Sequence, residues 1–265
     1  YKARVDKVLV ENDRAVGIRL ADSADAQAGA EYRADVVISN ADGRTTIYDM
    51  LDGRYTDERI NNYYANPPDR QEMGLNIYLG VARDLSHEPR AITYLLDQPV
   101  TIANETHDRL DIELFSFDPS MAPAGKSPLK VTMPGSYAYW QALAATSKDR
   151  YNEEKQRVAE TVIDAIEPRF PGLRGQIEAV DVTTPLTTER YTGSFQGLQA
   201  WSPSGAGFTA MLKGLSKTLP GLDSFYMVGQ WAGATIGIPL VAAMGRSLIQ
   251  NLCKRDGRRF VASVG

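Results

Sequence analysis

The sequence predicts a mixed α/β fold (α+β in character) in which one domain is split by an inserted domain. Short apolar runs near the two ends of the chain, at 34–42 and 225–229, are typical of strands in a parallel sheet. Longer segments with polar and apolar alternation lie between them, and an amphipathic helix follows. This order of hydropathy patterns predicts one domain that is split in the sequence by an inserted domain.

The first predicted element is a β-hairpin over residues 5–20. Apolar and β-branched residues stand on both sides of the polar segment 11–14, and a polar turn between two such runs is typical of a hairpin. The run at 34–42 is continuously apolar before it ends in small and polar residues. It predicts a strand that is buried on both faces.

The middle of the chain predicts an antiparallel sheet and one long helix. A helix over 148–167 is predicted from its single apolar face, with Thr146 and Asp149 as its capping box. The inserted domain is expected to cover 52–221, and the split domain 1–51 and 222–265. The predicted strands of the sheet cover residues 75–81, 92–96, 112–117 and 129–133.

The last part of the chain predicts a strand, a glycine-containing turn and a helix over 239–254, with Pro239 in the first turn. Residues 224–245 carry no charge over 22 positions, which is long enough for a membrane span. Glycines, Pro239 and Gln230 interrupt this stretch. We therefore expect a buried strand and helix there rather than a membrane span.

Composition excludes several classes of partner and site. The chain has 29 Lys and Arg against 33 Asp and Glu, and its net charge of -4 gives no positive field for nucleic acid. Cys253 is the single cysteine and His87 and His107 are the two histidines. We therefore expect no internal disulfide and no metal site, and a cytoplasmic, reducing compartment fits.

Protein side chains give no clear catalytic signal. Both histidines stand in polar segments and are expected at the surface, and no serine lies in a nucleophile elbow. Cys253 follows Leu252 on the last predicted helix and is expected to be a buried structural thiol. The catalytic residues are therefore unknown, and a cofactor is expected to carry the chemistry of an enzyme here.

The candidate cofactor signal is the segment 228–239, where a strand leads through glycines into a helix. Free N–H groups at such a helix start bind an anion or a carbonyl-bearing ring. Glycine-rich turns before helices also serve tight packing. Spacing alone leaves both interpretations open.

Three segments resemble the bacterial-type phytoene desaturase family, which includes carotenoid isomerases and retinol saturases. They are 35–42 (DVVISNAD), 184–193 (TPLTTERYTG) and 225–246, in the family's order, and the hairpin at 5–20 also matches. The resemblance implies an FAD-dependent oxidoreductase with a Rossmann-like flavin domain and a sheet-rich substrate domain. It also implies desaturation, saturation or isomerisation of a lipophilic isoprenoid or polyene, with hydride exchanged with the flavin.

The resemblance also implies site residues. The backbone of Val5 is expected to meet the adenine, and Asn40 and Ala41 to lie where the chain passes the cofactor. Gly229 and Gln230 match the family's residues that approach the ribityl–diphosphate chain of FAD. The helix start that faces the isoalloxazine ring is matched by Gly237, Ile238 and Pro239.

Aromatic residues are the candidates for lining a substrate channel, although aromatic residues on a sheet are often core instead. Glu189 and Arg190 are interpreted either as aids to proton movement or as an ion pair on a loop. The channel candidates are Tyr137, Tyr139, Trp140, Phe195 and Trp201.

Two departures from the family pattern matter. Thr235–Gly237 stands where the family has a run of glycines, and no Gly-x-Gly-x-x-Gly motif occurs in the chain. We therefore expect a C-terminal portion of a flavoenzyme, lacking the N-terminal half of the FAD domain, that binds FAD weakly or not at all by itself.

The expected partners are a lipophilic small molecule and the missing N-terminal half. Peripheral membrane contact fits an apolar substrate, and uncovered apolar surface would lead to self-association. One alternative is a non-catalytic module that binds an apolar ligand or a partner. The other is an amine-oxidase-like flavoenzyme with a polar amine substrate.

Overall fold

The computed structural model describes residues 3–21, 29–198, 200–201, 217–232 and 237–262. The chain forms two compact units: unit 1 contains residues 1–68 and 199–265, and unit 2 contains residues 69–198. These units differ from the predicted domains in assigning 52–68 and 199–221 to the split unit. Helix α1 (Glu58–Ala65) explains the assignment of the first segment, because its Tyr63 stacks on Trp201 with ring centroids 3.7 Å apart.

The predicted hairpin at the start of unit 1 is confirmed. Strand β1 (Val5–Glu11) pairs antiparallel with β2 (Arg14–Leu20), and the short strand β3 (Glu31–Arg33) pairs with β2. Asn12 and Asp13 form the turn with φ of 50° and 57°, the backbone that favours Asn and Asp in hairpins. An added Cβ on Gly17 would lie 2.2 Å from the carbonyl oxygen of Tyr32, so glycine allows β3 to approach β2.

Unit 1 also contains a pair of parallel strands, as the sequence predicts. Strand β4 (Val37–Ser39) pairs with β10 (Phe225–Met227). The prediction that β4 is buried on both faces is wrong: Val37 is buried but Ile38 is 42% exposed. Among the described residues of β4, the side of Val37 is therefore covered and the side of Ile38 is not.

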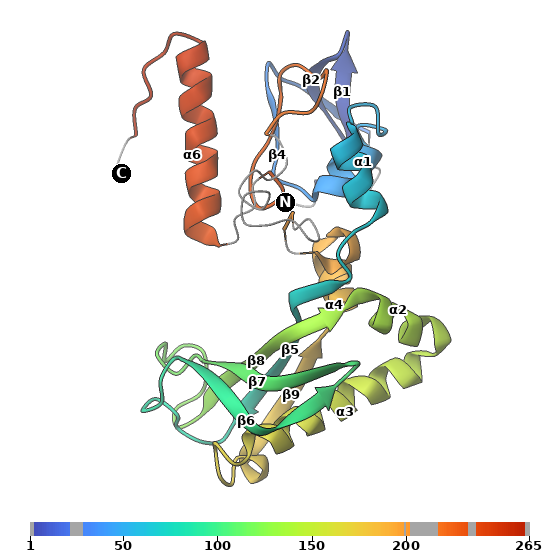
Figure 1. The fold of residues 1–265 in the computed structure, drawn as a ribbon. Coiled ribbons are helices and arrows are strands. Elements are labelled where there is room, and N and C mark those ends of the chain that lie inside the picture. Colours follow the sequence, from blue (N-terminus) through green and yellow to red (C-terminus); the bar gives the residue numbers. More distant parts are fainter. Residues whose placement is uncertain (1–2, 22–28, 199, 202–216, 233–236, 263–265) are drawn as a thin grey trace. The chain divides into compact units, whose positions relative to one another are not determined.

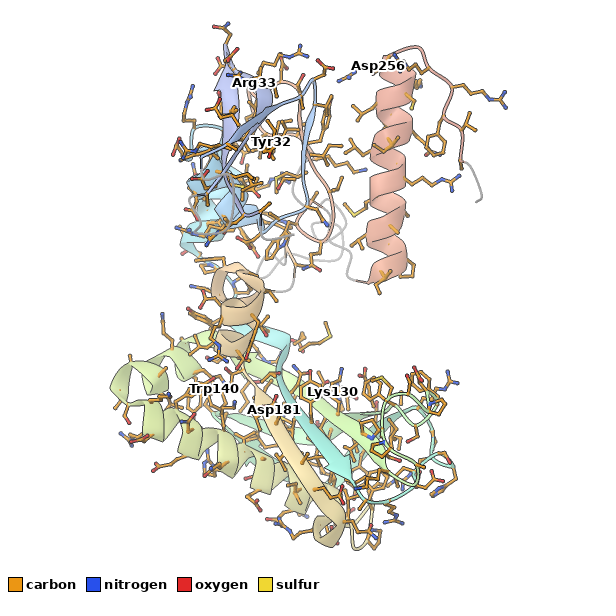
Figure 2. All side chains as sticks on the ribbon, turned by 180° about the vertical axis from the view of Figure 1, so that it is seen from behind. Tyr32, Arg33, Lys130, Trp140, Asp181 and Asp256 are labelled. Carbon is orange, nitrogen blue, oxygen red and sulfur yellow. The ribbon has the colours of Figure 1, made fainter. Side chains whose placement is uncertain are left out.

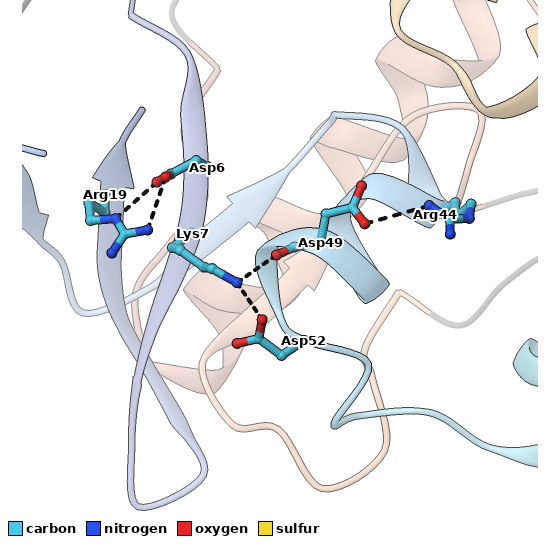
Figure 3. A network of polar contacts seen from close by, with 6 residues as sticks. All are labelled: Asp6, Lys7, Arg19, Arg44, Asp49 and Asp52. Carbon is cyan, nitrogen blue, oxygen red and sulfur yellow. Dashed lines mark hydrogen bonds and ion pairs between the residues drawn. The ribbon is translucent and has the colours of Figure 1, made fainter. Parts of the chain in front are cut away.

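Polar contacts join β1 to the π-helix η1 (Thr45–Met50) that follows β4 (Figure 3). Lys7 donates to the carbonyl oxygen of Asp49 at 2.8 Å and pairs with Asp52. Exposed pairs of this kind stabilise little individually. Together they hold the end of η1 against the hairpin.

Unit 2 contains the predicted antiparallel sheet, with one strand more than expected. The spatial order is β6-β7-β8-β5-β9 and every neighbouring pair is antiparallel (Figure 1). The strands are β5 (Arg70–Val81), β6 (Ala91–Ile102), β7 (Glu105–Leu114), β8 (Ser127–Ser136) and β9 (Ile177–Thr183).

Helices α2 (Tyr137–Thr146) and α3 (Lys148–Ile166) pack against this sheet (Figure 1). The long predicted helix is confirmed, but its cap is Ser147, whose hydroxyl accepts from the N–H groups of Asp149 and Arg150. Thr146 belongs to α2. The core between sheet and helices contains Leu75, Ile77, Leu79, Val81, Ile112, Val131, Met133, Val158, Val162 and Ile166.

The opposite face of the unit 2 sheet is polar. Asn76 accepts from Thr132 at 2.9 Å, and Lys130 pairs with Glu113 at 2.5 Å. Lys130 and Asp181, labelled in Figure 2, lie in register with Tyr78 on neighbouring strands. An antiparallel sheet with one core face and one polar face explains the alternation in the sequence.

After β9 the chain forms α4 (Pro185–Thr192) and the short turn η3 (Phe195–Gly197). A single turn of 3-10 helix, η2 (Arg174–Gln176), precedes β9. Thr184 caps α4 in a capping box with Thr187, and Gly193 ends it in the left-handed conformation. Local sequence therefore sets both ends of this helix.

The last helix, α6 (Ile238–Arg255), confirms the predicted helix but not its burial. Leu248 is the one buried residue of α6, and Ile238 is 83% exposed. No helix in the described part of the chain is long and apolar enough to cross a membrane.

Candidate functional site

The carboxyl ends of β4 and β10 bring together two of the predicted cofactor-binding segments. The backbone N–H of Val228 donates to the carbonyl oxygen of Ser39 at 2.9 Å, extending the parallel pairing by one residue. Asn40 follows β4 and Gly229 follows β10. Ligands of open α/β sheets bind outside the carboxyl ends of neighbouring strands, so this is the candidate site.

Asn40 and Gly229 approach each other more closely than any side chain at 229 permits. Gly229 has φ of +84°, in the left-handed region. A Cβ added there would lie 2.0 Å from Oδ1 of Asn40. The backbone conformation therefore favours glycine at 229, and a side chain there would also displace the amide of Asn40.

The loop after β4 is held by its own polar groups. The hydroxyls of Ser39 and Thr46 are 2.9 Å apart, and the N–H of Ala41 donates to Oγ of Ser39 at 3.3 Å. The N–H of Thr45 donates to Oδ1 of Asp42 at 2.8 Å. These bonds give the loop that carries Asn40 and Ala41 one defined path.

Buried aromatic rings pack beneath this loop. An added Cβ on Gly43 would lie 2.5 Å from the hydroxyl of Tyr64, and burial raises the pKa of that hydroxyl. Trp231 is buried beside Gly43. Trp201 is also buried, and its backbone N–H donates to the carbonyl oxygen of Gln230 at 3.3 Å. The structure thus places the channel candidate Trp201 in the core of unit 1.

The other predicted cofactor residues stand apart from this pair. Val5 lies on β1, in the antiparallel sheet. The residues 237–239 begin α6, where Gly237 has φ of 114° and no side chain caps the helix. In the described part of the chain, no hydrogen bond joins either group to Asn40 or Gly229. Residues 233–236 of the predicted turn lie outside the described residues.

The four channel candidates of unit 2 have different surroundings. Trp140 is fully buried in the core, between the rings of Tyr139 and Tyr151 (Figure 2), so for Trp140 the structure agrees with the core interpretation. Tyr139 is half-buried and its hydroxyl donates to Glu154 at 2.8 Å. Tyr137 is buried, and its hydroxyl donates to Glu189 at 2.9 Å. Phe195 is half-buried in η3.

Two cavities of the described chain have linings that include charged side chains. One of about 630 Å³ lies between α3 and β9, and its lining includes Lys155, Glu160 and Asp181. The other, of about 320 Å³, lies beside β1 in unit 1. Its basic side chains all have acidic partners: Lys7 has Asp52, Arg19 has Asp6 and Arg54 has Asp13. Neither lining includes a channel candidate.

The two histidines and the cysteine of the chain differ in how far the structure buries them. His107 is buried on β7, and burial lowers its pKa, so the prediction of a surface histidine is wrong for this residue. His87 is exposed, and Cys253 is half-buried rather than buried. Among the described residues no group of three or more His, Cys, Asp or Glu could hold a metal ion.

Glu189 and Arg190 lie on helix α4 rather than on a loop, and no ion pair joins them to each other in the described part of the chain. The carboxylate of Glu189 accepts from Tyr137 and from the backbone N–H of Gln196 at 3.0 Å. Arg190 is exposed, and its guanidinium lies 4.7 Å from the ring centroid of Tyr191. Sequence reasoning did not find the Glu189–Gln196 contact, because no local pattern signals a bond from a side chain to a loop backbone.

No family model matches the chain. It is 29% identical over 251 residues to a chloroplastic prolycopene isomerase of Daucus carota, covering 92% of this chain and 38% of the relative. It is 28% identical to a 4,4'-diapophytoene desaturase of a Methylomonas species, over 74% of this chain and 37% of the relative. The resemblance to the carotenoid desaturases and isomerases is confirmed.

Other comparisons agree with this resemblance. A phytoene desaturase (neurosporene-forming) of Cereibacter sphaeroides is 27% identical, over 77% of this chain and 38% of the relative. The solved structure of an oxidoreductase from Methanosarcina mazei matches with a TM-score of 0.54 at 18% identity, over 93% of this chain and 48% of that one. That match supports the predicted mixed α/β fold. The chain thus spans less than half the length of these proteins.

Proposed function

We propose that the chain is the part of an FAD-dependent oxidoreductase that contributes to flavin binding and holds a lipophilic isoprenoid or polyene. The observation that carries the proposal is the close approach of Asn40 and Gly229 at the ends of two parallel strands. It joins two segments of the family resemblance that lie far apart in sequence. The named relatives act on carotenoid polyenes, by isomerisation or desaturation.

The residues at this edge fit an extended flavin cofactor. The space that a Cβ of Gly229 would fill is taken by Oδ1 of Asn40, so a diphosphate or ribityl chain at this edge would meet the amide of Asn40 beside the bare backbone of Gly229. Asn40 would lie beside that chain, with Ala41 next to it. FAD, when bound, supplies hydride exchange with the substrate. The protein's own residues bind, orient and exclude water.

Further parts of the proposal concern the partners. The remaining flavin-domain contacts come from a segment with the Gly-x-Gly-x-x-Gly motif, so FAD binding by this chain alone is weak. Exposed apolar residues on α6 and β4, among them Ile238 and Ile38, favour self-association of the separate chain. Peripheral contact with a membrane is the way an apolar substrate would reach the protein.

The test is a thermal-shift titration of the 265-residue chain with millimolar FAD, a polyene in micelles, and an amine. We expect a small FAD shift and a polyene shift. Gly229→Ala should abolish the FAD shift. The matched control is Gly221→Ala, because Gly221 has φ of 73° in the same unit but no atom near an added Cβ.

Other outcomes would contradict the proposal. A shift with the amine but not with the polyene favours the amine-oxidase alternative. A polyene shift without any FAD response favours the non-catalytic binding module. An FAD response that Gly229→Ala leaves unchanged would show that FAD does not bind at this edge.

A further inference from the structure

The turn that follows α4 contains an unusual backbone conformation. Gln196 has φ of 53° and Gly197 has φ of 69°, so two consecutive residues are left-handed. An added Cβ on Gly197 would lie 2.2 Å from the carbonyl oxygen of Pro185, which makes glycine necessary there. For Gln196 the conformation is unfavourable and must be held by its surroundings.

Side chains from two other elements hold the backbone of Gln196 at both of its polar groups. Its N–H donates to Oε1 of Glu189 at 3.0 Å. Its carbonyl oxygen accepts from Nε2 of Gln71, on β5, at 2.8 Å. Gln71 is 8% exposed, and its Oε1 has no hydrogen-bond partner in the described part of the chain. The bond to Gln196 is therefore the polar contact that this buried amide makes.

A third element completes the arrangement. The other oxygen of Glu189, Oε2, accepts from the hydroxyl of Tyr137 at 2.9 Å. Tyr137 is the first residue of α2, and its N–H donates to the carbonyl oxygen of Asp69 at 3.2 Å. Both carboxylate oxygens of Glu189 are thus used, one for the turn and one for α2.

Phe195 directly precedes Gln196 and is half-buried. The N–H of Gln196 belongs to the peptide group that joins the two residues, so the bond to Glu189 restricts the direction in which the side chain of Phe195 leaves the backbone. We propose that Gln71, Tyr137 and Glu189 are positioning residues that hold Phe195 in one orientation for contact with the polyene, an inference that rests on the proposed function. The role of Tyr137 is then to orient Glu189 rather than to touch the substrate.

The chain offers a matched control for Glu189. Glu167, after α3, also uses both carboxylate oxygens to hold a turn, accepting from the N–H groups of Gly172 at 2.6 Å and Arg174 at 3.0 Å. This turn is in the same unit and does not include a channel candidate. Glu189→Gln and Glu167→Gln each replace one acceptor oxygen by a donor in the same kind of contact.

The experiment measures two quantities on the full chain and on Glu189→Gln, Gln71→Met and Glu167→Gln. Amide hydrogen exchange at Gln196 reports whether Glu189 and Gln71 still hold its backbone; we call these two contacts the clamp. Quenching of tryptophan fluorescence by lycopene in micelles reports polyene binding. We expect about tenfold faster exchange at Gln196 and about tenfold weaker lycopene binding in Glu189→Gln and Gln71→Met. Glu167→Gln should accelerate exchange at Gly172 and leave lycopene binding unchanged.

Three results would overturn the inference and leave the proposed function intact. Unchanged exchange at Gln196 in both variants would show that there is no clamp. Faster exchange with unchanged lycopene binding would show that the clamp does not position a substrate contact. Equal loss of lycopene binding in Glu167→Gln would show a general effect of loosened turns. A parent chain that binds no lycopene at all contradicts the proposed function, and the inference falls with it.

Discussion

The two units of this chain are stabilised in different ways. Unit 2 has one continuous core between a five-stranded sheet and its helices, filled by large aliphatic side chains. In the described part of unit 1 an added Cβ would lie within 2.5 Å of a neighbouring atom at Gly17, Gly43 and Gly229, whereas in unit 2 this holds for Gly197 alone. Unit 2 should therefore be most sensitive to loss of side-chain volume in its core, and unit 1 to a gain of volume at these glycines.

The largest expected effect is in the core of unit 2. Ile77 is fully buried on β5, an inner strand of the five-stranded sheet. Ile77→Ala should lower the free energy of unfolding by about 2–5 kcal/mol, because it removes buried methyl groups and leaves a cavity. Urea unfolding followed by circular dichroism measures this. A loss below about 1 kcal/mol would contradict the idea of a closely packed core.

The second-largest effect is expected in unit 1, where a substitution adds one methyl group at Gly229. Gly229→Ala should destabilise the chain by about 1–3 kcal/mol, since it combines a left-handed backbone with a collision at Oδ1 of Asn40. Asn40→Ala in the same chain should recover part of the loss, because it removes that oxygen. Additive effects in this double-mutant cycle would mean that the two residues do not touch.

A smaller effect concerns a polar contact of unit 2 at alkaline pH. Burial, and the hydrogen bond to Glu189, raise the pKa of Tyr137 to about 12. A raised pKa in the folded state stabilises below the unfolded value near 10, and the contribution is lost as pH rises from about 10 to 12. Tyr137→Phe should flatten this alkaline decline by about 1–2 kcal/mol. Melting temperatures of both proteins between pH 8 and 12 measure it, and parallel curves would contradict it.

The smallest effect is at acid pH. The hydrogen bonds from Arg169 hold the pKa of Glu88 below its usual range. The contribution is present above the unfolded pKa of a glutamate and is lost as pH falls through the lowered value. Glu88→Gln should cost about 0.5–1 kcal/mol at pH 7 and almost nothing at pH 2.5. An equal cost at both pH values would show that shape, and not charge, matters at this position.

Most helices and strands whose apolar residues recur with a clear period were predictable from the sequence. The hairpin turn at Asn12–Asp13, the alternating strands of unit 2 and the amphipathic helix α3 each have a local signal that the structure confirms. The short apolar runs at 34–42 and 225–229 predicted two strands of a parallel sheet, and the structure adds that β4 and β10 pair with each other. Local chemistry and the fold agree in these places.

Burial and side-chain contacts were less predictable. His107 stands in a polar segment, and only the register of β7 places it on the covered face. The exposure of α6 could not be read from its uncharged sequence, since burial depends on what packs against a helix. The link from Gln71 to Gln196 joins residues far apart in the chain, and no spacing rule connects them.

The pairing of β4 with β10 has a consequence for the order of folding. Residues from opposite ends of the chain must meet before unit 1 can form this sheet, whereas every strand of unit 2 lies within 69–198. During synthesis from the N-terminus, β10 emerges after all of unit 2. Folding of unit 2 shortens the loop that separates the two partner strands and so reduces its closure entropy. We therefore expect unit 2 to fold first and the β4–β10 pair of unit 1 to form last.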